Sequence, residues 1–135
     1  MSGTEVMATI QEKILSRTIK EITPFGVRIE LNLDGRISGE LYTAQHTETV
    51  SLFQKTDGTF ESEAKAIEAT KEGDVFVISY RGTGKQTGLT TIWGEGVGIV
   101  MTQSKKFANL NNAQVRVEVN ADIATGDVRV SYYKM

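Results

Sequence analysis

The chain has 135 residues and a formal net charge of −2 at pH 7, with 39% hydrophobic and 24% charged residues. This balance predicts one globular domain with a core of its own, because disordered chains carry fewer apolar residues and more net charge. The absence of cysteine excludes disulfides, thiolate zinc sites and cysteine nucleophiles, and no basic cluster exceeds Lys105-Lys106, which disfavours nucleic-acid binding.

The N-terminal residues carry no targeting signal that we can identify. Residues 1–10 lack the basic start and apolar stretch of a signal peptide, and no apolar run approaches the roughly 18 residues of a membrane-spanning helix. We therefore expect a cytoplasmic protein without a membrane partner. Residues 1–9 are expected to form a flexible tail and residues 10–135 a single domain.

In the first half of the chain, apolar and polar residues mostly alternate with a period of two. Residues 12–22 fit a strand or a short helix, and we favour the strand. In residues 25–33, apolar and polar side chains alternate, which is typical of a half-buried antiparallel strand; its apolar face holds Val27, Ile29, Leu31 and Leu33. The pair Asp34-Gly35 then predicts a hairpin turn before a strand over residues 36–42.

Residues 47–55 and 59–69 flank a second turn, TDGT at 56–59. The stretch 61–71 is rich in Ala, Glu and Lys, which favours a helix. Small or apolar residues nevertheless alternate with charged ones there, so we expect a strand; the inward face would carry Phe60, Ser62, Ala64 and Ala66.

The second half of the chain repeats the pattern. Strands are expected over 74–82 and 89–102, joined through 84–88, and over 114–120 and 127–133, joined through 121–127. Residues 104–111 are expected to form a loop with one helical turn. Short, evenly spaced strands with tight turns indicate an all-β fold, a sandwich or a barrel. We favour a single antiparallel β-barrel of about eight strands with at most one short helical turn.

Glycines occupy every second position of the segment IWGEGVGIV, at 94, 96 and 98. Such a bare face lets a strand coil strongly, as closing a small barrel demands. A hairpin with Lys85 opposite Gly88 turns the glycines outward or against a neighbour, where they could mark a contact in a homo-oligomer. It also gives an inward apolar patch of Phe76, Ile78, Tyr80, Trp93 and Val97, with Glu95 among them.

This register defines the candidate site. Glu95 would be a carboxyl group with a raised pKa that acts as acid or base, assisted by Tyr80. The alternative is that Glu95 is a hydrogen-bonded or outward-facing charge. Ordinary core packing is the alternative for the aromatic residues. The ligand-binding wall would consist of Trp93, Phe76, Ile78 and Val97, with the hydroxyls of Tyr42 and Tyr132 facing the cavity.

The only histidine, His46, has polar neighbours in TAQHTE and is expected in a solvated turn. A single histidine also excludes a histidine-based metal cluster, and we expect no metal and no cofactor. The glycine pairs lack the strand, loop and helix of a nucleotide-binding fingerprint.

Several stretches of the second half resemble the allene oxide cyclase–like barrel group. They are YRGTGK at 80–85, IWGEGVG at 92–98, KFANLN at 106–111 and ATGDV at 124–128, followed by Tyr132-Tyr133. The resemblance implies an eight-stranded antiparallel barrel with a central cavity. Some members of that group catalyse cyclisations by holding an unsaturated substrate in a productive shape. No catalytic motif can be transferred residue by residue.

The sequence thus leaves three hypotheses. The first is a barrel that binds an apolar or amphipathic small molecule in its lumen. The second is a cyclase or isomerase that acts on an unsaturated substrate there. The third is a barrel with a filled interior that serves as a structural or assembly module.

Overall fold

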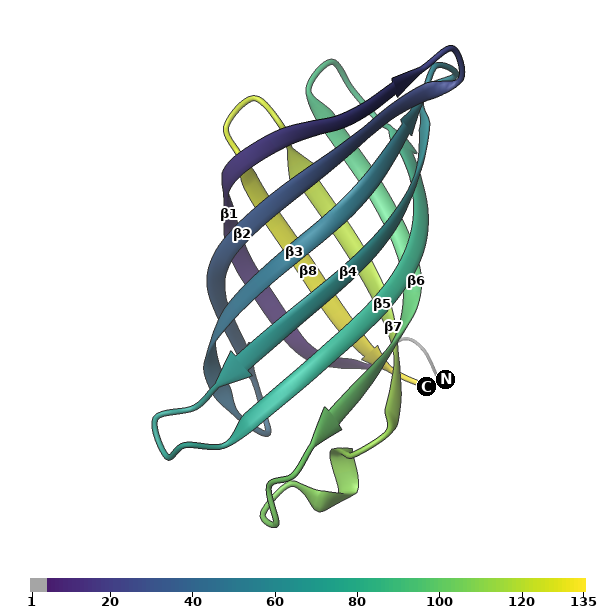
Figure 1. Ribbon diagram of the computed structural model, residues 1–135. Coiled ribbons are helices and arrows are strands. Elements are labelled where there is room, and N and C mark those ends of the chain that lie inside the picture. Colours follow the sequence, from purple (N-terminus) through teal and green to yellow (C-terminus); the bar gives the residue numbers. More distant parts are fainter. Residues whose placement is uncertain (1–4) are drawn as a thin grey trace.

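The computed structural model describes residues 5–135, which form one closed barrel of eight antiparallel strands (Figure 1). The strands follow one another around the barrel, and β1 closes it by pairing with β8. One 3-10 turn, η1, precedes β7, so the predicted fold class is confirmed. The elements are β1 Val6–Thr23, β2 Gly26–Gly39, β3 Thr43–Lys55, β4 Thr59–Ala69, β5 Val75–Gln86, β6 Thr91–Thr102, η1 Ala108–Leu110, β7 Ala113–Asp122 and β8 Asp127–Lys134.

Both segments with an ambiguous sequence are strands, β1 and β4. Their side chains alternate between the interior and the solvent, which outweighs the helix-forming composition of β4. β1 begins at Val6, inside the predicted tail of residues 1–9, because Met7 and Ala8 are buried in the core. Residues 1–4 of that prediction lie outside the described residues. Within the part of the chain that the structure describes, no helix is long and apolar enough to cross a membrane.

Consecutive strands are joined by short connections that alternate between the two ends of the barrel (Figure 1). At the end drawn uppermost, Gly58 and Gly126 adopt positive φ angles of 89° and 81°. This conformation suits glycine because it has no Cβ. The turns predicted at 56–59 and 121–127 are confirmed.

The turn predicted at Asp34-Gly35 is wrong. β2 continues through both residues to Gly39, and the chain reverses at residues 40–42 instead. Gly35 serves a close approach between strands rather than a turn, since a Cβ there would lie 2.1 Å from the Gln11 carbonyl oxygen.

The apolar faces predicted for three strands do face the interior. Leu33, Val115 and Val130 are almost completely buried, and their neighbours Leu31 and Val119 are partly buried against the core. Three aromatic rings, from the β2–β3 connection, β5 and the residue before η1, pack together at one end of the barrel. Tyr42 and Phe76 stack at 4.1 Å between ring centroids, and Phe107 meets Phe76 edge-on at 5.2 Å. The interior is therefore packed at this end.

The predicted register between β5 and β6 is wrong, and the error exchanges the two faces of β6. Tyr80 lies opposite Gly98, not Trp93, because the turn lies at residues 87–90. The three glycines of β6 therefore face the interior. A Cβ at Gly94 would lie 3.2 Å from the ring of Phe60, and one at Gly98 would lie 2.8 Å from the Cβ of Tyr80. Gly94 and Gly98 make room for the side chains of Phe60 and Tyr80, and Gly96 allows a close approach to the β5 backbone at Arg81. The glycines therefore form no outer face for a subunit contact.

Candidate functional site

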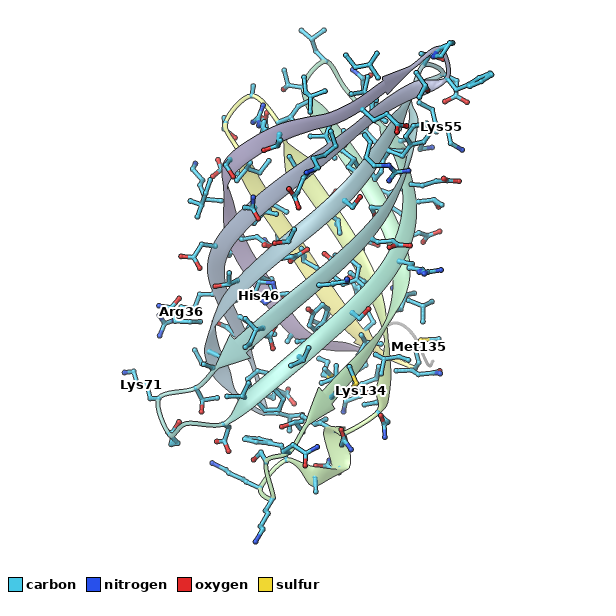
Figure 2. All side chains as sticks on the ribbon, viewed as in Figure 1. Arg36, His46, Lys55, Lys71, Lys134 and Met135 are labelled. Carbon is cyan, nitrogen blue, oxygen red and sulfur yellow. The ribbon has the colours of Figure 1, made fainter. Side chains whose placement is uncertain are left out.

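The middle of the barrel holds a buried polar cluster that the sequence analysis did not predict. Three carboxyl groups, the only histidine and three tyrosines face inward from five strands and from the β2–β3 connection. Its members are Glu12, Tyr42, His46, Glu48, Glu68, Tyr80 and Tyr132, each at most 8% exposed. In Figure 2, His46 lies within the barrel, whereas Arg36 and Lys71 project away from it. Among the described residues no lysine or arginine is buried, so the cluster carries an excess of acidic groups.

Three members of this cluster and one glycine occupy neighbouring positions across four strands of the sheet. Glu12, Gly35, His46 and Glu68 are successive partners on β1, β2, β3 and β4. Because residues in one row point to the same side, all four face the lumen. Gly35 contributes no side chain, so His46 Nε2 lies 3.9 Å from Glu12 Oε1 across the β2 backbone.

Gly35→Ala is expected to lower the free energy of unfolding by about 3 kcal/mol, the upper end of the usual cost of overpacking. The new Cβ would lie 2.6 Å from the Cα and Cβ of Glu12, so β1 must move away from β2. Urea unfolding followed by circular dichroism measures the change. Ser38→Ala, on the exposed part of the same strand, is the matched control and is expected to change stability by less than about 0.5 kcal/mol. Equal stability of the two variants would contradict this role of Gly35.

A continuous chain of hydrogen bonds connects five of the cluster residues. His46 bonds through Nδ1 to Glu68 Oε2 at 2.6 Å and through Nε2 to Glu48 Oε1 at 2.8 Å. The Tyr42 hydroxyl donates to Glu68 Oε1 at 2.6 Å, and the Tyr80 hydroxyl donates to Glu48 Oε2. Each carboxylate of the pair thus accepts one bond from the imidazole and one from a tyrosine. Small residues on β4, Ala64 and Ala66, lie between Tyr80 and Glu48 in the ladder and leave space for the ring.

The imidazole of His46 is held in its protonated form. Burial by itself lowers its pKa, but the hydrogen bonds to Glu48 and Glu68 and the nearby negative charges raise it more. The net result is a pKa raised from 6.5 to about 10. Since both ring nitrogens face carboxylates, an imidazolium donates two hydrogen bonds where a neutral ring donates only one.

Glu12 and Tyr132 are buried without a hydrogen-bond partner among the described residues. Burial and the charge of Glu48 raise the pKa of Glu12 from 4.5 to about 10, so this carboxyl group is neutral at pH 7. Burial and the charges of Glu68 and Glu48 also raise the pKa of Tyr132 well above 10, which keeps its hydroxyl protonated. A buried polar atom without a partner is rare and calls for an explanation.

Above the cluster lies an apolar cavity of about 80 Å³ inside the barrel. Glu48 and Tyr80 line it at the cluster, and Ile123, which is 40% exposed, lines it toward the upper end. Its walls come mainly from apolar residues of seven strands, among them Ile14, Leu31, Val50, Phe60, Ile92, Val119 and Val128.

The structure brings together five of the eight residues that were predicted to form the site. Tyr42, Phe76, Ile78, Tyr80 and Tyr132 are buried inside the barrel. The other three residues point away from it because of the exchanged faces of β6.

Trp93, Glu95 and Val97 lie on the outer face, where Glu95 is exposed and Val97 is 50% exposed. Their predicted inward orientation is wrong. The prediction of a solvated His46 is also wrong, since this side chain is completely buried.

The comparisons with known proteins support the fold. No family model matches the chain, and no curated protein matches it either. A protein of unknown function from Clostridium acetobutylicum is similar in structure, with a TM-score of 0.85 and 15% identity over 97% of both chains. A β-barrel-like protein from Acinetobacter baumannii has a TM-score of 0.78 and 13% identity, over 96% of this chain and 92% of the other.

An enzyme from Penicillium herquei is also similar, with a TM-score of 0.69 and 15% identity over 96% of this chain and 92% of the other. At such identities the likeness shows a shared fold and carries no activity across. The protein is thus a small β-barrel of the architecture found in these structures.

Proposed function

We propose that the barrel binds a small, mostly apolar molecule that carries a hydrogen-bond donor at one end. The observation behind this proposal is the apolar cavity whose polar end consists of Glu48 and Tyr80. Each carboxylate oxygen of Glu48 already accepts one hydrogen bond, and each has a second lone pair to offer. An alcohol or a phenol could donate to it while the apolar walls enclose the rest of the molecule.

Ligand binding is expected to favour probes with a hydroxyl group over purely apolar probes of the same size. Phenol and benzene form such a pair, and native mass spectrometry with a thermal shift assay measures their binding. Phenol is expected to bind more tightly, because only it can donate a hydrogen bond to Glu48.

Ser62→Leu tests whether the probe lies in the cavity. Ser62 lines the cavity on β4, so a leucine there fills the space and is expected to weaken phenol binding at least tenfold. Ser38→Leu adds the same side chain at an exposed position of β2 and is expected to leave binding unchanged. Equal binding by both variants would contradict a lumen site. No binding of any probe would favour the third hypothesis, a filled barrel with a structural role.

A second candidate function is proton transfer on an unsaturated substrate, as in an isomerase or a cyclase. The specific observation is the hydrogen-bonded chain from Tyr80 through Glu48, His46 and Glu68 to Tyr42, one end of which reaches the cavity. Glu48 would accept a proton from the substrate, and the Tyr80 hydroxyl would donate one. The resemblance to allene oxide cyclase–like barrels and the similar fold of the Penicillium herquei enzyme agree with this candidate.

Proton transfer can be tested with a small β,γ-unsaturated ketone in deuterated water. Isomerisation with deuterium incorporation is expected for the wild type, and a loss of at least 100-fold is expected for Glu48→Gln. Glu95→Gln, on the outer face, is expected to keep the wild-type rate. A Glu48→Gln chain that binds phenol but shows the wild-type rate would sink the catalytic role of Glu48.

The remaining predictions from the sequence concern the location of the protein in the cell and its oligomeric state. A cytoplasmic location and a homo-oligomer stay predictions, and the glycine face no longer supports the second of them.

A further inference from the structure

The buried polar cluster contains three side chains that can bind one metal ion together. His46 Nε2 lies 2.8 Å from Glu48 Oε1 and 3.9 Å from Glu12 Oε1, and one ligand atom from each of the three residues lies within 4.8 Å of the others. Nitrogen and oxygen ligands bind zinc at about 2.0–2.2 Å, so neighbouring ligands of a tetrahedral ion are roughly 3.4 Å apart. Shifts of about 1 Å in three side chains would therefore form a metal site.

The surroundings of His46 match those of metal-binding histidines. Its Nδ1 bonds to Glu68, and Glu68 in turn accepts a hydrogen bond from Tyr42. A carboxylate on the second ring nitrogen is the usual partner of a histidine ligand, because it fixes the ring orientation and makes the free nitrogen a better ligand. Here this arrangement directs Nε2 toward Glu12 and Glu48.

Two further observations favour a cation as a ligand of the cluster. Both oxygens of Glu12 and the hydroxyl of Tyr132 are buried without a hydrogen-bond partner among the described residues. The protonated His46 is the one buried cation beside the three carboxyl groups of the cluster, since no lysine or arginine is buried in residues 5–135. Buried carboxylates need a counter-charge or a metal ion.

We propose that Glu12, His46 and Glu48 form a binding site for a divalent first-row transition-metal ion at the polar end of the cavity. A donor set of one imidazole and two carboxylates without sulfur suits Zn²⁺, Mn²⁺ or Fe²⁺. This site replaces the expectation, drawn from the single histidine, that the protein binds no metal. It does not depend on the proposed lumen ligand.

The test uses the full chain without a histidine tag, stripped of metal with EDTA and titrated with Zn²⁺. One equivalent is expected to bind, and Co²⁺ is expected to give the visible absorption of a low-symmetry N/O site. Because the chain has one histidine, NMR reports coordination directly. On addition of Zn²⁺, Nε2 is expected to carry no proton and to bind the metal, while Nδ1 keeps its proton toward Glu68.

Two variants distinguish a proposed metal ligand, Glu12, from the residue that orients His46, Glu68. Glu12→Gln is expected to weaken Zn²⁺ binding at least 100-fold, and Glu68→Gln, which removes the partner of Nδ1, is expected to weaken it 10- to 100-fold. Glu72→Gln, in the exposed β4–β5 connection, is the control and is expected to bind like the wild type.

The proposal would be overturned by wild-type protein that binds no Zn²⁺, Co²⁺ or Mn²⁺ below about 100 μM. Equal binding by the wild type and by a folded Glu12→Gln chain would also overturn it. If Glu12→Gln does not fold, the NMR signals of His46 in the wild-type protein provide the test instead. An imidazole ring that keeps protons on both nitrogens in the presence of Zn²⁺ does not bind the metal and would overturn the proposal. Phenol binding is measured separately, so a failure of this proposal leaves the lumen ligand untouched.

Discussion

Replacing His46 with leucine is expected to lower the free energy of unfolding by about 3–5 kcal/mol. The substitution removes the cation between Glu48 and Glu68 and leaves two buried carboxylates side by side, and breaking a buried ion pair by removing one partner costs this much. For a domain of this size the melting temperature would fall by roughly 12–20 °C. Urea and thermal unfolding of the metal-free protein at pH 7 measure both values.

Two further variants distinguish the effect of the unpaired carboxylate charges from a loss of packing. Adding Glu48→Gln and Glu68→Gln to the His46→Leu chain removes both uncompensated charges, so this triple variant is expected to be more stable than His46→Leu alone. Arg81→Leu breaks an ion pair with Glu63 on the exposed outer face and is expected to cost less than about 1 kcal/mol. A His46→Leu chain as stable as Arg81→Leu would contradict the role of His46.

The metal-free protein is also expected to lose stability as the pH rises from 6.5 to 9. The folded-state pKa of His46 is raised to about 10, so its contribution is complete below pH 6.5 and is lost as the pH approaches 10. The pKa of Glu12 is also raised to about 10, and the unfolded chain releases this proton above about pH 4.5. Both groups therefore change stability in the same direction.

The size of this effect follows from the number of protons that only the folded state keeps. For each such proton, the free energy of unfolding falls by about 1.4 kcal/mol per pH unit. One proton therefore accounts for a loss of about 3 kcal/mol between pH 6.5 and 9. Urea unfolding at several pH values in the presence of EDTA measures the slope. Glu12→Gln cannot release a proton and is expected to halve the slope, whereas Glu72→Gln is expected to keep it. A stability that stays constant or rises over this range would be the contrary result.

Much of the fold could be predicted because a period of two is a strong local signal. Val115, Val117 and Val119 alternate with polar residues, and only one face of a strand can be buried in a small barrel. The orientation of β6 could not be predicted in the same way. Its glycines carry no side chain that shows a preference for water or core, so the orientation depended on the turn. That turn lies at residues 87–90 rather than at 84–88.

The polar cluster was missed because local sequence does not show which residues lie together in a barrel. His46 has Gln45 and Thr47 as neighbours and looks solvated in sequence. Its burial follows from the second-neighbour positions instead, since Ala44 is also buried on the same face of β3. The partners Glu12 and Glu68 come from other strands, and only the register places them beside it.

The central claim is that a charged histidine lies between two carboxylates inside the barrel. The most direct measurement is the NMR spectrum of the imidazole ring in uniformly ¹⁵N-labelled, metal-free protein as a function of pH. The chain has one histidine, so its signals need no assignment. We expect protons on both ring nitrogens at pH 8, with loss of the first only near pH 10. A ring that loses a proton with a midpoint near pH 6.5, as a solvated histidine does, would contradict the account.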